Sequence, residues 1–172
     1  YKTDGFPART ESNVASGHEN DSVNAFLNFD HDNWSLVTNV WQSSGTTEYL
    51  DFFLTPVSQD FNNTTGSLDI NKIFSDRWVS NLNFGFSRDD IKQNETPDFN
   101  DSKKLFFEWQ NTINAHDNHQ IVAGIYLANE KFDASNYGLD TAAEANSTAV
   151  YIEDDSNRGK HQLLTAAIVI NI

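Results

Sequence analysis

The sequence predicts an all-β fold in which about eight strands run up and down, each antiparallel to the next. Three observations predict it. Apolar and polar residues alternate with a period of two, which places them on opposite faces of a strand. The alternating stretches are rich in Phe, Trp, Val, Ile and Thr, which favour strands. The segments between them are rich in Asp, Asn and Ser, which favour turns.

The period-two pattern predicts eight strands, at 22–30, 34–43, 64–74, 77–88, 103–114, 118–131, 147–154 and 160–171. In the strand at 77–88, for example, Leu82, Phe84 and Phe86 alternate with Asn83 and Gly85. The pattern is mixed in the strands at 34–43 and 147–154.

The connections between these strands alternate in length. Short polar turns are expected at 30–33, 75–76, 115–117 and 155–159. Long loops are expected at 44–63, 89–102 and 132–146, and the opening 21 residues read as another long loop. Tight turns at one end and large loops at the other are typical of an antiparallel meander whose two ends face different surroundings.

A transmembrane β-barrel explains both patterns. Its strands need ~9–11 residues to cross a bilayer while tilted. Lipid contacts the apolar row of each strand, while Asn, Gln, Ser and Thr face a polar interior. Aromatic residues near the strand ends suit the girdles at the two interfaces. These aromatic residues are Trp34, Trp41, Trp78 and Phe132.

Two other architectures fit the same alternation. One is a soluble β-sandwich with one buried face, secreted and binding carbohydrate through Trp and Tyr. The other is a small closed outer-membrane barrel that acts as an anchor or adhesin, since eight strands can close around their own side chains. The position of the apolar rows separates these possibilities, because a sandwich packs them together in a dry centre.

Composition excludes several classes of function. The 172 residues predict one domain over 1–172, and 11 basic against 25 acidic side chains give a net charge of −14. That balance argues against nucleic acid as a partner. Without cysteine there is no disulfide, thiolate nucleophile or cysteine metal site. The sequence contains no G-x-S-x-G, G-x-G-x-x-G or P-loop motif, so we expect no enzyme. A charged segment followed by an apolar one is also missing at its start, so we expect no signal peptide in it.

The expected long loops hold the candidate binding residues. Clustered carboxylates suit Ca²⁺, which takes 6–8 oxygen ligands, and Asp51 and Asp60 are the candidate ligands. His116 and His119, three residues apart in a turn, are a less favoured metal pair. Further acidic residues of the loops are Asp89, Asp90, Asp101, Asp133 and Asp140. The residues expected to contact a ligand are Tyr49, Phe52, Phe53, Asp98 and Tyr137.

Several stretches carry a family resemblance, in order and through most of the chain, although none is a strict motif. They are YKTDGF at 1–6, SVNAFL at 22–27, EYLDFFLTP at 48–56, EWQN at 108–111, VAGI at 122–125 with NEK at 129–131, TAVYI at 148–152 and GKHQLLTAA at 159–167. Through them the chain resembles the TonB-dependent outer-membrane receptors of bacteria, most nearly the cobalamin transporter branch.

The resemblance implies a 22-stranded barrel filled by a plug domain. It implies uptake of a large nutrient, such as cobalamin or a metal chelate, energised by the TonB complex through that plug. The cobalamin transporters order their binding loops with calcium, which implies ligands near Tyr49–Asp60. The adjacent Tyr-Asp of the family is Tyr49-Leu50-Asp51 here, so the register of these ligands is in doubt. Because the plug is not in this sequence, the chain is expected to be a middle arc of eight strands.

Overall fold

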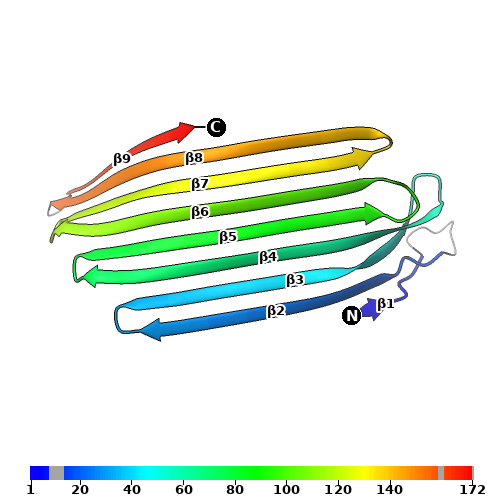
Figure 1. Cartoon of the computed structure of the whole chain (residues 1–172), viewed down its shortest axis with the longest axis horizontal. Coiled ribbons are helices and arrows are strands. Elements are labelled where there is room, and N and C mark those ends of the chain that lie inside the picture. Colours follow the sequence, from blue (N-terminus) through cyan, green and yellow to red (C-terminus); the bar gives the residue numbers. More distant parts are fainter. Residues whose placement is uncertain (8–13, 159–160, 172) are drawn as a thin grey trace.

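The chain forms a single layer of antiparallel strands, each hydrogen-bonded to its neighbour in sequence (Figure 1). The computed structural model describes residues 1–7, 14–158 and 161–171. The strands are β1 (Lys2–Thr3), β2 (His18–His31), β3 (Trp34–Leu50), β4 (Pro56–Ser75), β5 (Trp78–Gln93), β6 (Phe99–His116), β7 (His119–Asn136), β8 (Leu139–Arg158) and β9 (His161–Asn171). No helix formed by these described residues is long and apolar enough to span a membrane.

The expected antiparallel meander of eight strands is confirmed, with the short β1 added at its edge. Two of the expected alternatives are wrong for the described part of the chain. All its strands belong to one sheet, so no second sheet packs against it as in a sandwich. Moreover, β2 and β9 lie at opposite sides of that sheet and do not pair, so the eight long strands do not close into a small barrel (Figure 1).

The predicted long loops are the main error, because most of their residues belong to strands. Of 44–63, 89–102 and 132–146, only 51–55, 94–98 and 137–138 lie outside the strands. The opening segment likewise enters β2 at His18, and part of it, 8–13, lies outside the described residues. From β2 to β8, the connections are therefore short at both ends of the sheet.

Polar cross-strand pairs explain why these segments continue as strands. Thr46 Oγ1 donates to Asp60 Oδ1 (2.6 Å), and Gln42 Nε2 donates to Asn62 Oδ1 (3.1 Å), both between β3 and β4. Such opposed pairs stabilise a sheet as apolar pairs do. The low strand propensity of Asp, Asn and Ser is therefore overruled by pairing with the neighbouring strand, which is not visible in a local window.

The pairing register assigns every strand residue to one of two faces, because directly paired residues point the same way. Phe29 pairs with Leu36, Leu36 with Ile70 and Ile70 with Leu82, and the row continues across the sheet. We call this side the apolar face. Its apolar band consists of Val23, Leu27, Phe29, Leu36, Val40, Leu68, Ile70, Trp78, Leu82, Phe84, Phe86, Leu105, Phe107, Trp109, Ile113, Ile121, Ile125, Leu127, Val150 and Ile152.

The opposite side, the polar face, carries mostly amides, hydroxyls and carboxylates. It includes Asn24, Asn39, Ser67, Asp69, Asn71, Asn81, Asn83, Glu108, Gln110 and Gln120. Trp41 and Phe132 also lie on this face, so the expectation that both belong to a lipid-facing girdle does not fit the register. Trp34 and Trp78 do lie on the apolar face, near the ends of their strands.

Residues 1–7 and 14–156, whose side chains the structure describes, have almost no core of their own. Their buried hydrophobic residues are Ala128 and Ala134, and no large side chain among them is fully buried. Most of the apolar band is exposed, including Leu27, Phe84 and Ile152. An exposed apolar surface of this extent marks a site of contact with a membrane or another protein.

Candidate functional site

Three hairpin tips lie together at one end of the sheet, on the right in Figure 1. They are residues 51–55 between β3 and β4, 94–98 between β5 and β6, and 137–138 between β7 and β8. Six of the seven candidate metal and ligand residues lie in these tips or directly beside them, and Asp60 lies further along β4. We call this region the tip cluster.

The Asp51 carboxylate shapes the first tip. Its Oδ1 accepts hydrogen bonds from the backbone N–H groups of Phe53 and Thr55, both at 2.8 Å. The turn also holds Leu54 in the left-handed region at φ 62°, a conformation that non-glycine residues rarely adopt. As a result Phe52 and Phe53 project outward, 85% and 82% exposed, with their rings edge to face at 5.5 Å.

Hydrogen bonds join the first tip region to the second. Glu95 accepts from the Ser58 N–H at Oε2 (2.9 Å) and from the Ser58 hydroxyl at Oε1 (3.0 Å). The Ser58 backbone N–H, followed by its hydroxyl, holds the pKa of Glu95 below its usual range. On the polar face, Gln93 Nε2 donates to the Tyr49 hydroxyl oxygen, which places Tyr49 within the sheet rather than in a loop.

The second tip is joined to the third through two candidate residues. The Tyr137 backbone N–H donates to Asp98 Oδ1 (3.0 Å). Tyr137 and Gly138 both have positive φ, 53° and 77°, which is the geometry of a two-residue type I′ hairpin turn. The Tyr137 side chain is 96% exposed. The tip cluster therefore presents exposed aromatic rings on a hydrogen-bonded frame.

The structure does not bring Asp51 and Asp60 into one metal centre. Asp60 lies on β4, where its Oδ1 accepts hydrogen bonds from Thr46 Oγ1 and from Asn94 Nδ2 (3.3 Å). Asp51 Oδ1 instead accepts from the backbone of its own turn. Among the residues that the structure describes, no group of three or more His, Asp or Glu side chains is arranged to hold a metal ion. Calcium binding at Asp51 and Asp60 stays a prediction that this donor set does not by itself support.

The other acidic residues of the expected loops belong to strands. Asp90 and Asp101 are paired neighbours on the apolar face, and Arg88 Nη2 contacts both carboxylates, at 3.2 and 3.1 Å. Partial burial alone would raise the pKa of Asp101, but Lys103 and Arg88 hold it below its usual value. Asp89, Asp133 and Asp140 are likewise strand residues, of β5, β7 and β8.

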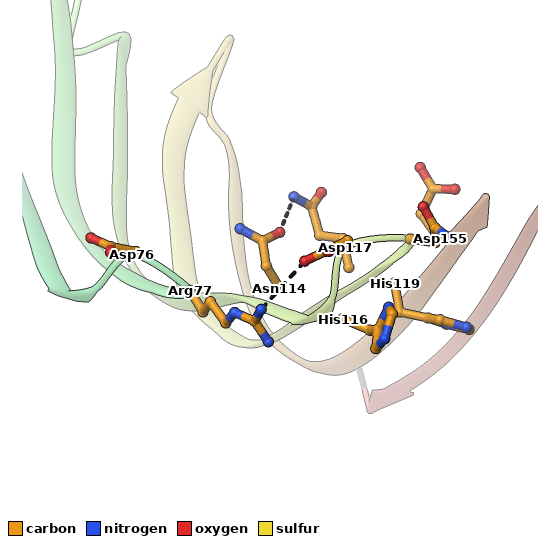
Figure 2. A pocket seen from close by; sticks show the side chains of 9 residues that line it. Asp76, Arg77, Asn114, His116, Asp117, His119 and Asp155 are labelled. Atoms are coloured by element: carbon orange, nitrogen blue, oxygen red, sulfur yellow. Dashed lines mark hydrogen bonds and ion pairs between the residues drawn. The ribbon is translucent and has the colours of Figure 1, made fainter. Parts of the chain in front are cut away.

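A hollow lies at the end of the sheet opposite the tip cluster. It measures about 540 Å³ and lies between the β4–β5 and β6–β7 turns, where Arg77 reaches Asp117 (3.3 Å; Figure 2). His116 and His119 both line it, and His119 Nδ1 lies 3.6 Å from Asp154 Oδ1. These histidines belong to no group of three potential metal ligands within the described chain.

The contacts that frame the tip cluster were missed at the sequence level. Ser58 and Glu95 are 37 residues apart, and Asp98 and Tyr137 are 39 apart. A correct hairpin register would have placed Glu95 beside Ser58. The β6–β7 register, which pairs Phe99 with Ser135, would likewise have placed Asp98 beside Tyr137.

Comparison with known proteins gives no match among family models, curated proteins or solved structures. The function is therefore argued from the geometry of the chain. Two features carry that argument: the apolar band on one face, and the exposed rings of the tip cluster.

Proposed function

We propose that this chain is an arc of a bacterial outer-membrane β-barrel, of the TonB-dependent receptor type, that takes up a large nutrient such as a corrinoid or a metal chelate. The observation that supports this proposal most directly is the open sheet, which has an apolar band on one face and mostly polar side chains on the other. In this arrangement lipid covers the apolar band, and the polar face lines the barrel interior. The tip cluster then lies on the extracellular side.

The height of the apolar band suits a bilayer. On β6 it extends from Leu105 to Ile113, which is ~27 Å along the strand at ~3.4 Å per residue. A strand tilted by about 40° converts this length to a height of about 21 Å, against ~25 Å for the apolar belt of an outer-membrane barrel. Beyond Leu105 toward the tips, Lys103 and Asp101 follow on the same face.

The band also crosses the strands obliquely, as it must if tilted strands cross a flat membrane. On β2 it covers the row of Phe29 and the three rows toward the tips, up to Val23. On β8 it covers the row of Val150 and one row away from the tips, Ile152. The centre shifts by two rows, ~14 Å, over six strand spacings, ~29 Å, which is an angle of about 25°. This angle is smaller than the ~35–45° tilt typical of outer-membrane barrel strands, but it too inclines all the strands to the membrane in one direction.

The polar face suits a hydrated interior or a polar plug. Asn71 and Asn81 are paired there, and Glu108 and Gln110 follow on β6. The Tyr151 hydroxyl donates to Glu108 Oε1 (2.9 Å). Polar side chains at this depth would be costly against lipid, so their presence favours water or protein on this side.

Uptake of this kind changes no covalent bond. Exposed aromatic rings such as Phe53 and Tyr137 offer large, rigid contact surfaces to a macrocyclic ligand. Passage would then follow displacement of a plug driven by the TonB complex, a domain outside this sequence. The protein with this chain would act as a receptor and transporter rather than an enzyme.

Two tryptophans on opposite faces provide the test. Trp109 belongs to the apolar band, and Trp41 lies on the polar face. Two versions of the whole protein are made, one with Trp109 and one with Trp41 as its sole tryptophan. They are reconstituted into vesicles with brominated acyl chains, which quench tryptophan fluorescence on contact. We expect strong quenching of Trp109 and little quenching of Trp41, with the order reversed for aqueous acrylamide. Equal quenching of both, or of neither, would contradict the membrane arrangement.

A further inference from the structure

Three cations lie in one row at the tip-side margin of the apolar band. The register pairs Arg88 with Lys103 and Lys103 with Lys131, so all three share the apolar face on neighbouring strands. Arg88 and Lys103 each follow an apolar residue of the band, Phe86 and Leu105, at the next position on that face. The chain has only 11 basic residues, so three in one row is a marked concentration.

Such a row has an energetic cost, because like charges directly opposite each other destabilise a sheet. Two carboxylates, Asp101 one row further from the band and Glu144 in the row itself, offset part of that cost. Asp101 Oδ2 lies 3.1 Å from Arg88 Nη2 and 2.9 Å from Lys103 Nζ. Lys131 Nζ lies 3.3 Å from Glu144 Oε1, in the same row on β8.

Arg88 and Lys103 differ from their partner Asp101 in access from outside. The side chains of Arg88, Lys103 and Lys131 are 50%, 47% and 51% exposed, whereas that of Asp101 is 18% exposed. Glu144, the partner of Lys131, is 48% exposed. From the band toward the tips, the order on β6 is Leu105, Lys103 and Asp101. A group that approaches along the apolar band therefore meets Arg88 and Lys103 before the more enclosed Asp101.

We propose that Arg88, Lys103 and Lys131 bind the phosphate of a membrane lipid headgroup while its acyl chains lie on the apolar band. Guanidinium and ammonium groups are the usual partners of phosphate oxygens. Two strand spacings set the row at about 10 Å, which suits a phosphorylated headgroup. The adjoining apolar band favours a lipid over free phosphate, because the acyl chains add apolar burial. This inference rests on the membrane arrangement proposed above.

Native mass spectrometry tests the site. The whole protein carrying this chain is released from micelles that hold equal amounts of phosphatidic acid and phosphatidylcholine, and the retained lipids are counted. We expect the wild type to retain phosphatidic acid preferentially. The R88Q/K103Q/K131Q variant should lose this preference about fivefold or more. The control K2Q/R77Q/K104Q removes the same charges from β1, a turn and the polar face, and should behave as the wild type.

Three outcomes would overturn the proposal. They are unchanged retention in R88Q/K103Q/K131Q, an equal loss in the control variant, and binding of inorganic phosphate as tight as that of phosphatidic acid. Trp109 quenching by brominated phosphatidylcholine is measured in parallel on the version of the protein in which Trp109 is the sole tryptophan. If Trp109 is quenched and the preference is absent, the lipid site alone fails. If Trp109 is not quenched, the membrane arrangement fails and the lipid site with it.

Discussion

An arginine placed in the middle of the apolar band gives the sharpest prediction. Phe84 lies at the centre of β5, flanked on the same face by Leu68 of β4 and Phe107 of β6. The next residue toward the N-terminus, Asn83, lies on the polar face of the same strand. The substitutions Phe84→Arg and Asn83→Arg therefore add the same charge at the same depth, on opposite faces.

The expected cost follows from the surroundings of the two positions. Arginine at the lipid-facing midplane of a barrel costs about 2–4 kcal/mol, whereas lumen positions tolerate polar changes. Phe84→Arg should thus lower the folding equilibrium constant by about thirtyfold to several hundredfold. Asn83→Arg should change it by less than about threefold. Urea-dependent folding of the whole protein into phosphatidylcholine vesicles measures both values.

Two results for these variants would contradict the assignment of the apolar face to lipid. An Asn83→Arg cost equal to or above that of Phe84→Arg would mean that the polar face, not the apolar face, meets hydrocarbon. Equal small costs would mean that neither face does. Either result would remove the basis for the proposed barrel.

Three further predictions concern the tips and the polar face. Because its folded pKa is lowered, Glu95 stabilises the Ser58 contact fully above the ordinary carboxyl pKa of 4.5 and loses this effect as pH falls through the lower folded value. Hydrogen exchange at the Ser58 amide, corrected for intrinsic rates, should therefore show acid-dependent opening in the wild type and none in Glu95→Gln. Phe53→Ala should weaken binding of a probe such as cyanocobalamin about tenfold or more in titration calorimetry, with unfolding free energy unchanged within about 0.5 kcal/mol. Gly124→Ala would place a Cβ 2.4 Å from the Tyr151 ring and 2.8 Å from the Trp109 carbonyl oxygen, and should destabilise by about 1–3 kcal/mol in urea melts. Y151A should relieve only the part of this cost that comes from the ring.

The alternation along the chain was sufficient to predict the strands but not where they end. Period two located Leu82, Phe84 and Phe86 on one face, and the register confirms this arrangement. The sequence around Asp60 and Asn62 reads as a loop because its residues favour turns in isolation. These residues are recognised as strand residues only when the neighbouring strand is known, because Asp60 pairs with Thr46 and Asn62 pairs with Ser44, both of β3.

The tip cluster shows the same limit. Exposed Phe52 and Phe53 beside a turn-forming Asp51 were accessible to sequence reasoning. The Asp98–Tyr137 contact and the row of cations were not, because both depend on how neighbouring strands pair. The contact depends on the β6–β7 register, and the row depends on the β5–β6 and β6–β7 registers. A one-residue slip of any strand would move its charges to the other face.

The hydrogen bonds of the tips connect different hairpins rather than the two strands of one hairpin. Ser58 is bound to Glu95, and Asp98, three residues further, is bound to Tyr137. Displacement of one turn is therefore transmitted to the next. The three turns lose conformational entropy on folding, so the proposed ligand would not have to order them again on binding. The tip cluster is preorganised in this sense, and a ligand that contacts Phe53 and Tyr137 together would bind one connected surface instead of three independent turns.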